Sequence, residues 1–121
     1  MEIHKNQSLY ARLRFAAAGI SHGLRTERSL RTQALVLLLV VLALLMLRPA
    51  PLWWALVILC SAAVLAAELF NTAIERLVDH LHPELHAEIR IVKDCAAAAV
   101  LCVSIGAIGV AIALLVDITR H

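Results

Sequence analysis

The segment ELFNTAIERLVD, from Glu68 to Asp79, carries the side chains best suited to chemistry in this sequence. On an α-helix, with about 100° between successive residues, its polar side chains fall within about 80° of one another. These side chains are Glu68, Asn71, Glu75 and Asp79, here called the acidic stripe. Like charges one or two turns apart repel, so the stripe indicates either a compensating cation or a function. A solvated helix end at a membrane surface is the simpler alternative.

Other charged groups are expected at the same membrane level, because neighbouring helices enter the membrane there. Glu27 lies in ERSLR before the first apolar run, and Lys93 and Asp94 precede the last one. Carboxylate and amide oxygens suit Mg²⁺, which in turn binds phosphate oxygens, and an ammonium group neutralises phosphate charge. The combined set therefore predicts phosphoryl transfer.

Transfer of a phosphoryl group to an alcohol also requires a group that takes the hydroxyl proton. Glu68 lies at the end of an apolar run, near the hydrocarbon edge, and is our candidate for this general base. The sequence shows no Gly-rich P-loop, protein kinase HRD or DFG set, HExxH motif or Ser-His-Asp arrangement. The histidines of HLHPELH could bind metal, but Pro83 interrupts their helical spacing and favours a solvated loop.

The elements that position these groups are predicted to be membrane helices. Of the 121 residues, 62% are hydrophobic and 4% are aromatic, and the mean hydropathy is +0.86. This composition is too apolar for a soluble fold and too poor in aromatic residues for a β-barrel with aromatic girdles. The net charge of +2 comes without a basic stripe, which argues against a nucleic acid partner. We expect an all-α integral membrane protein.

Hydropathy predicts a single membrane-embedded domain over residues 1–121 with three spans, at about 29–48, 52–70 and 91–117. The second helix should continue to about residue 81. The RPAP segment between the first two spans predicts a tight hairpin, since Pro49 and Pro51 cannot lie inside a helix without loss of hydrogen bonds. Residues 6–26 have apolar side chains at helical spacing and predict an amphipathic surface helix. A purely topogenic role for its arginines is the alternative.

Basic residues flank the spans unequally, which predicts the orientation. One side has Lys5, Arg12, Arg14, Arg25, Arg28, Arg31, Arg76, Arg90 and Lys93, whereas the other has only Arg48 and Arg120. The N-terminus and the site should therefore be cytoplasmic, with the C-terminus outside. We expect all three spans to be retained, because the pattern does not match a cleaved signal peptide. We expect the three cysteines to be small buried hydrophobic residues rather than a disulfide framework or a metal site. They are Cys60, Cys95 and Cys102.

ELFNTAIERLVD is followed, fourteen residues after Asp79, by KD, and GLRTERSLR and KDCAAAAV complete the pattern. These segments resemble the signature of the prokaryotic diacylglycerol kinase family, which also contains undecaprenol kinases. The resemblance implies a homotrimer of three-span subunits in the bacterial inner membrane. It also implies composite active sites at the cytoplasmic face that transfer the γ-phosphate of ATP to a lipid hydroxyl.

The resemblance further implies a role for each matching residue. Glu68 corresponds to the general base, and Glu27 and Glu75 correspond to the carboxylates that bind Mg²⁺ beside ATP. The residues implied to support the nucleotide and catalysis are Asn71, Asp79, His86, Lys93 and Asp94.

The choice of lipid acceptor depends on residues at which this sequence departs from the family pattern. Phe70 and Gln33 stand where the family more often has an aliphatic residue and a glutamate, and Leu85 replaces a loop tyrosine. We favour diacylglycerol as acceptor, with undecaprenol as the alternative. A small oligomeric proton-coupled transporter would also use membrane carboxylates, but its site would lie at mid-membrane. A non-catalytic membrane scaffold would not need the acidic stripe.

Overall fold

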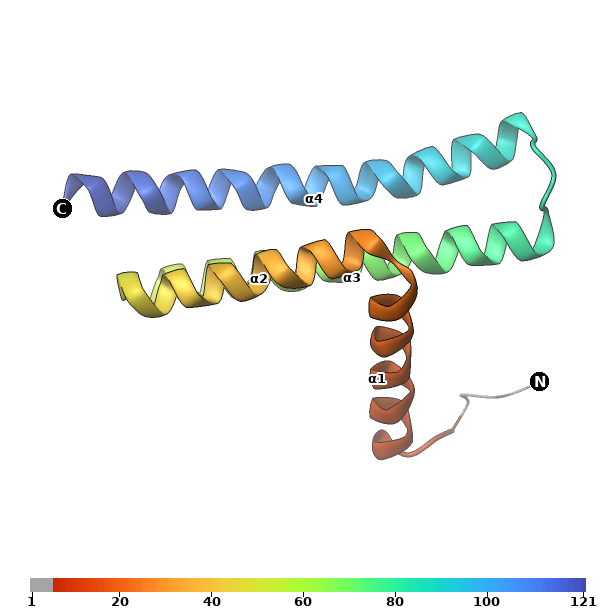
Figure 1. The fold of residues 1–121 in the computed structure, drawn as a ribbon, viewed down its shortest axis with the longest axis horizontal. Coiled ribbons are helices and arrows are strands. Elements are labelled where there is room, and N and C mark those ends of the chain that lie inside the picture. The colour runs from red at the N-terminus through yellow and green to blue at the C-terminus, as the bar shows by residue number, and fades with distance from the viewer. Residues whose placement is uncertain (1–5) are drawn as a thin grey trace.

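A computed structural model describes residues 6–121, and within this range the chain forms four helices (Figure 1). They are α1 (Leu9–Thr26), α2 (Arg28–Leu47), α3 (Pro51–Leu81) and α4 (Ala87–Arg120). The last three are long and apolar enough to cross a membrane, and they lie along one common direction. The predicted all-α membrane fold is confirmed. Lys5, which contributed to the predicted orientation, lies outside the described residues.

The helix ends follow from local sequence. The backbone N–H of Ala11 donates to Ser8 Oγ at 3.2 Å, which caps α1. Arg48, with φ 48° and ψ 54°, ends α2 in the left-handed conformation. Pro51 begins α3, where its missing N–H has no helical partner to lose. The RPAP segment therefore makes the predicted hairpin between α2 and α3.

The junction between α1 and α2 is a single residue, Glu27. Its backbone is extended, with φ −108° and ψ 117°, and its N–H donates to the Gly23 carbonyl at 2.8 Å. Arg31 Nη1 donates to the carbonyls of Leu24 and Arg25 at 3.1 and 3.0 Å. These bonds supply hydrogen-bond donors to carbonyl groups in the last turn of α1, which lack partners within the helix. The helix α1 therefore turns sharply away from the membrane-spanning helices (Figure 1).

Close packing fixes this turn of the chain. Gly23 is buried, and a Cβ atom there would lie 2.7 Å from Leu30 Cδ2 and 3.4 Å from Leu69 Cδ2. The absence of a side chain at Gly23 thus lets α1 approach both α2 and α3. This contact determines where Glu27, four residues further on, lies relative to α3.

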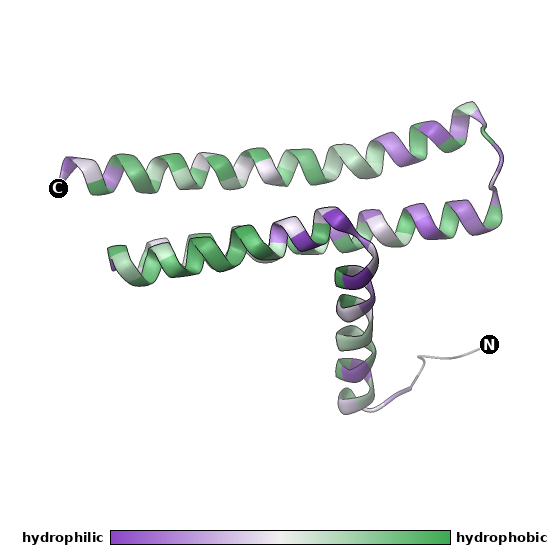
Figure 2. Ribbon diagram, viewed as in Figure 1, coloured by the Kyte–Doolittle hydropathy of each residue, from purple (hydrophilic) through white to green (hydrophobic). Residues whose placement is uncertain are grey.

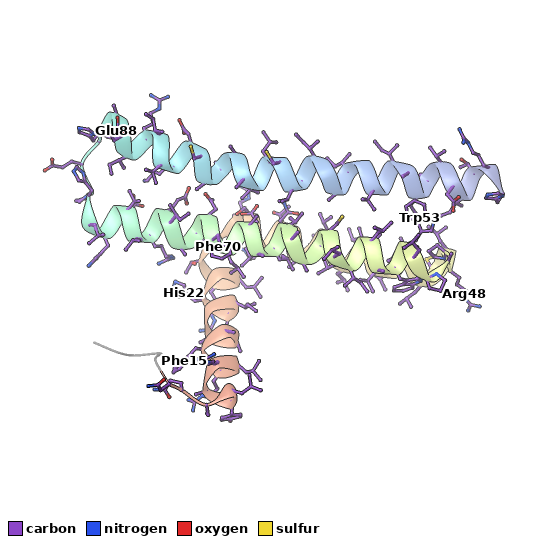
Figure 3. All side chains as sticks on the ribbon, turned by 180° about the vertical axis from the view of Figure 1, so that it is seen from behind. Phe15, His22, Arg48, Trp53, Phe70 and Glu88 are labelled. Carbon is purple, nitrogen blue, oxygen red and sulfur yellow. The ribbon has the colours of Figure 1, made fainter. Side chains whose placement is uncertain are left out.

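The long helix α3 is the centre of the fold, since it packs against each of the other three helices. Among the described residues, the backbones of α2 and α4 do not approach closely: none of their Cα atoms lie within 8 Å of one another. An apolar cavity of about 480 Å³ lies between α2, α3 and α4. Leu44, Val57 and Leu114 form the buried core at one end, together with Trp53, which lies at the end of the α3 and α4 pair (Figure 3).

Hydrophobic residues predominate along α2, the first part of α3 and the later part of α4 (Figure 2). On α4, for example, Leu101, Ile105 and Ile108 are each 60% exposed, as expected for side chains that face lipid. Hydrophilic residues gather at the other end, beside α1 and the loop between α3 and α4 (Figure 2). The same exposure corrects one expectation: Cys95 and Cys102 are free and exposed rather than buried, because α4 packs through only one face.

Candidate active site

The acidic stripe is held by the second half of α3, which continues as one helix through the apolar run and past it. Its first member, Glu68, is only 4% exposed. Ser29 Oγ donates a hydrogen bond to Glu68 Oε2 at 2.9 Å. A buried carboxylate needs a polar partner, and the first turn of α2 supplies it here. The junction between α1 and α2 therefore lies directly over the start of the stripe.

A polar cavity of about 480 Å³ lies further along α3, towards its C-terminal end. Its lining residues are Glu27, Glu75, Arg76, Asp79 and His80. Arg76 Nη2 lies 3.6 Å from Glu27 Oε1, with about half of the arginine side chain exposed. The structure thus brings together three of the predicted site residues, Glu27 from the junction between α1 and α2, and Glu75 and Asp79 from α3.

Lys93 joins the site from α4. Its Nζ lies 2.5 Å from Asp79 Oδ1, and the two side chains are 37% and 62% exposed. The pair bridges α3 and α4 across the loop of residues 82–86. An ammonium group is therefore held at the edge of the polar cavity, in reach of an anion that enters it.

Asp94 and His86 are predicted site residues that neither line the cavity nor form a hydrogen bond or ion pair, among the described residues, with a residue that does. Asp94 is 73% exposed and lies 4.0 Å from Arg90 on its own helix. His86 caps the start of α4, where its Nδ1 accepts from the backbone N–H of Glu88 at 3.1 Å. Its ring lies edge-on to that of His82, with 6.0 Å between ring centroids. Both residues occupy the loop side of the site rather than the cavity itself.

Asn71 lies one turn beyond Glu68 and carries an unpaired acceptor. Its Oδ1 is buried and has no hydrogen-bond partner within the described part of the chain. It is the only such side-chain atom among the described residues that are not exposed. A buried carbonyl oxygen left in this way costs about 1–3 kcal/mol, which favours a role in binding a donor or a cation.

Sequence reasoning missed Ser29 and Arg76 as site residues, and it assigned His80 to a solvated loop, whereas His80 lies in α3 and lines the polar cavity. Each had a signal in the sequence, because Ser29 follows Glu27 by two residues and Arg76 and His80 lie inside or beside the ELFNTAIERLVD segment. Their contacts depend on how α1, α2 and α3 meet, which helical periodicity does not specify.

The carboxylates fit a divalent ion that arrives with its phosphate ligands. Among the described residues, no three His, Cys, Asp or Glu side chains form a ready metal-binding group. Glu27, at the junction between α1 and α2, and Glu75, on α3, nevertheless line the same cavity. Mg²⁺ commonly binds through one or two carboxylates and completes its octahedron with water and phosphate oxygens. The donor set is therefore suited to Mg²⁺ with a nucleotide rather than to a protein-only metal site.

The geometry separates two kinds of group along one helix. Glu68 lies at the apolar end of the stripe, and Glu75 lies seven residues, or about 10 Å, further towards the polar end. A polyphosphate in the polar cavity could extend its terminal phosphate towards Glu68. The arrangement can thus join a water-soluble phosphate donor to an acceptor that reaches the site from the membrane.

Two comparisons with known proteins bear on this arrangement. The family model described as prokaryotic diacylglycerol kinase matches residues 14–115, which include both the polar cavity and Glu68. A curated relative from Synechocystis sp., named diacylglycerol kinase, is 36% identical over 102 residues. The match covers 84% of this chain and 58% of that relative, so the chain spans a little over half of the relative's length.

Proposed function

The chain belongs to the prokaryotic diacylglycerol kinase family, and on this premise we propose that it transfers the γ-phosphate of ATP to the hydroxyl group of a membrane lipid. The single observation that carries the proposal is the position of Glu68, which is buried at the start of a stripe that leads to the polar cavity. A general base at the edge of a membrane span suits an acceptor that lies in the membrane, whereas a kinase with a water-soluble acceptor does not require this position.

The polar cavity is the proposed site for the triphosphate. Glu27 and Glu75 would hold Mg²⁺, which when bound neutralises charge on the phosphate oxygens. Lys93 would add a positive charge close to the phosphates, and Asp79 keeps its ammonium group in place through the contact described above. Arg76 would supply a second cation on leaving Glu27 for the phosphates. Asn71 Oδ1, which is buried and unpaired, is available for a donor between the cavity and Glu68.

Glu68 is the proposed general base. As the lipid oxygen attacks, a bond forms between this oxygen and the γ-phosphorus, and the bond from that phosphorus to the β–γ bridging oxygen breaks. The electron pair of the broken bond leaves with ADP, and the hydroxyl proton passes to the Glu68 carboxylate. The products are ADP and a phosphorylated lipid.

We infer that diacylglycerol is the acceptor and phosphatidic acid the product. The name of the Synechocystis relative supports this choice, and undecaprenol is the alternative within the same family. Gln33, one of the residues that departs from the family pattern, lines the apolar cavity between α2, α3 and α4. Leu85, another departure, is fully exposed in the loop next to His86.

We further propose that the chain forms a homotrimer in the bacterial inner membrane. Asp94 and His86 lie outside the cavity of their own chain, so a neighbouring subunit could present its corresponding side chains to a shared site. Arg76, Arg90 and Lys93 lie near the α1 end of the spans, which supports a cytoplasmic site and N-terminus and an outside C-terminus.

The test is an assay of purified protein in mixed micelles with Mg·ATP and either diacylglycerol or undecaprenol. Phosphate incorporation into diacylglycerol is expected. Faster incorporation into undecaprenol would reassign the acceptor. A folded oligomer that phosphorylates neither lipid would contradict the kinase and leave the transporter or scaffold interpretation.

A further inference from the structure

Ser29 is the residue that ties Glu68 to a second helix. It lies in the first turn of α2, and its Oγ donates to Glu68 Oε2 at 2.9 Å. Among the described residues, the structure gives Glu68 no other side-chain hydrogen bond. The orientation of this carboxylate therefore depends on one hydroxyl group.

The two oxygens of the Glu68 carboxylate have different surroundings. Oε2 is held by Ser29, whereas Oε1 has no hydrogen-bond partner among the described residues. Within that same part of the chain, Asn71 Oδ1 is the only fully buried and unpaired side-chain atom in a residue that is not exposed. Oε1 is thus the unpaired oxygen of a carboxylate whose residue is only 4% exposed. Among the described residues, the carboxylate therefore has one oxygen held by a hydrogen bond and one oxygen whose acceptor capacity is unused.

We propose that Ser29 is a positioning residue, which binds Oε2 so that Oε1 is directed to accept the proton of the lipid hydroxyl. This inference rests on the lipid kinase function proposed above. The terminal torsion of a glutamate side chain is broad, so an unrestrained carboxylate would sample many directions. Proton transfer requires the base within hydrogen-bond reach of the hydroxyl, and a misplacement of about 1 Å can lower a rate by about 100-fold.

The position of Ser29 argues against an ordinary capping role for its hydroxyl. The N-cap of α2 is Glu27, and the hydroxyl of Ser29 donates to a side chain on α3 rather than to its own helix. Thr32, one turn later, makes the usual local bond of a helical hydroxyl to the backbone of its own helix: its Oγ1 donates to the Arg28 carbonyl at 3.1 Å. Thr32 therefore provides a matched control: a hydroxyl at the same end of α2 whose hydrogen bond goes to the backbone of its own helix rather than to Glu68.

The experiment compares Ser29→Ala, Ser29→Thr and Thr32→Ala in the micelle assay with Mg·ATP and diacylglycerol. Loss of a hydrogen bond to a carboxylate predicts that Ser29→Ala lowers kcat roughly 10- to 100-fold. The KM for ATP should stay near the wild-type value, because Ser29 does not line the polar cavity. Ser29→Thr, which keeps a hydroxyl, should recover most of the turnover, and Thr32→Ala should match the wild type.

A double-mutant cycle tests whether Ser29 acts through Glu68. In a Glu68→Gln background, Ser29→Ala should cause little further loss, because the two residues form one unit. A wild-type kcat in Ser29→Ala, or a loss in Ser29→Thr as large as that in Ser29→Ala, overturns the inference. In either case, turnover by the unmodified protein leaves the kinase proposal intact. A folded wild-type protein without lipid phosphorylation overturns both.

Discussion

The indole Nε1 of Trp53 donates a hydrogen bond to Asp117 Oδ2 at 2.9 Å, joining the first turn of α3 to the last turns of α4. The contact between Asp79 and Lys93 joins the same two helices at their other end. The antiparallel helices α3 and α4 are thus linked by side-chain contacts at both ends. The bond between Trp53 and Asp117, at the opposite end from the polar cavity, therefore helps to set the register of α4 on α3 that brings Lys93 to Asp79.

This bond predicts a difference between two neighbouring tryptophans. Trp53→Phe removes the donor and should lower the unfolding free energy by about 1 kcal/mol, since Asp117 is partly exposed and water can replace the indole. Trp54 also packs on the core, but within residues 6–121 the structure shows no hydrogen bond from its indole. Trp54→Phe is therefore the control. Thermal unfolding in detergent should give a lower Tm for Trp53→Phe, and equal Tm values would show that the bond does not stabilise the helix pair.

The two glycines of α1 provide a second matched comparison. A Cβ atom at Gly19 meets nothing within 4 Å, so Gly19→Ala should stabilise the helix by about 1 kcal/mol. At Gly23 the added Cβ presses on Leu30, which is 2% exposed, and overpacking of this kind costs about 1–3 kcal/mol. Gly23→Ala should therefore have the lower Tm and, because α1 shifts Glu27, the lower kinase activity. The packing account is wrong if the two variants behave alike.

Arg76 should matter for the nucleotide and little for stability. Its ion pair with Glu27 is long, at 3.6 Å, and partly exposed, so Arg76→Gln should change the unfolding free energy by less than about 1 kcal/mol. Loss of a cation beside the triphosphate should raise the KM for ATP roughly tenfold. Arg25→Gln is the control, because Arg25 is exposed and does not line the cavity. An unchanged KM in Arg76→Gln would exclude Arg76 from the phosphate site.

Metal binding can be measured apart from turnover. With Mn²⁺ as probe and a non-hydrolysable ATP analogue, Glu75→Gln should raise the Mn²⁺ concentration needed for half-saturation about tenfold or more, because one of two carboxylate ligands is lost. Glu84 is exposed in the loop and outside the cavity, so Glu84→Gln should bind Mn²⁺ like the wild type. Identical titrations for both variants would place the ion elsewhere.

Much of the fold is predictable because membrane helices obey simple rules. Long apolar runs indicate three spans, and the RPAP segment stops one helix and starts the next. The acidic stripe follows from helical angles alone, since α3 is continuous from Pro51 to Leu81. These features depend on residues close together in the sequence.

The contacts between helices are what the sequence does not predict. Ser29 and Glu68 are 39 positions apart, and Trp53 and Asp117 are 64 apart, so no local pattern pairs them. The turn at Glu27 depends on how closely Gly23 approaches Leu30. Asp94 adjoins Lys93 in the sequence, yet on a helix neighbouring residues point about 100° apart, and Asp94 lies beside Arg90 instead.

The most direct test of the central claim is phosphate transfer from labelled Mg·ATP to diacylglycerol, measured for the wild type and Glu68→Gln side by side. Both proteins should assemble alike and bind the ATP analogue with similar affinity, because Glu68 lies outside the polar cavity. The wild type should produce labelled phosphatidic acid, and Glu68→Gln should lose most of the turnover. Equal rates in the two proteins, or no labelled lipid from a folded wild type, would contradict the account.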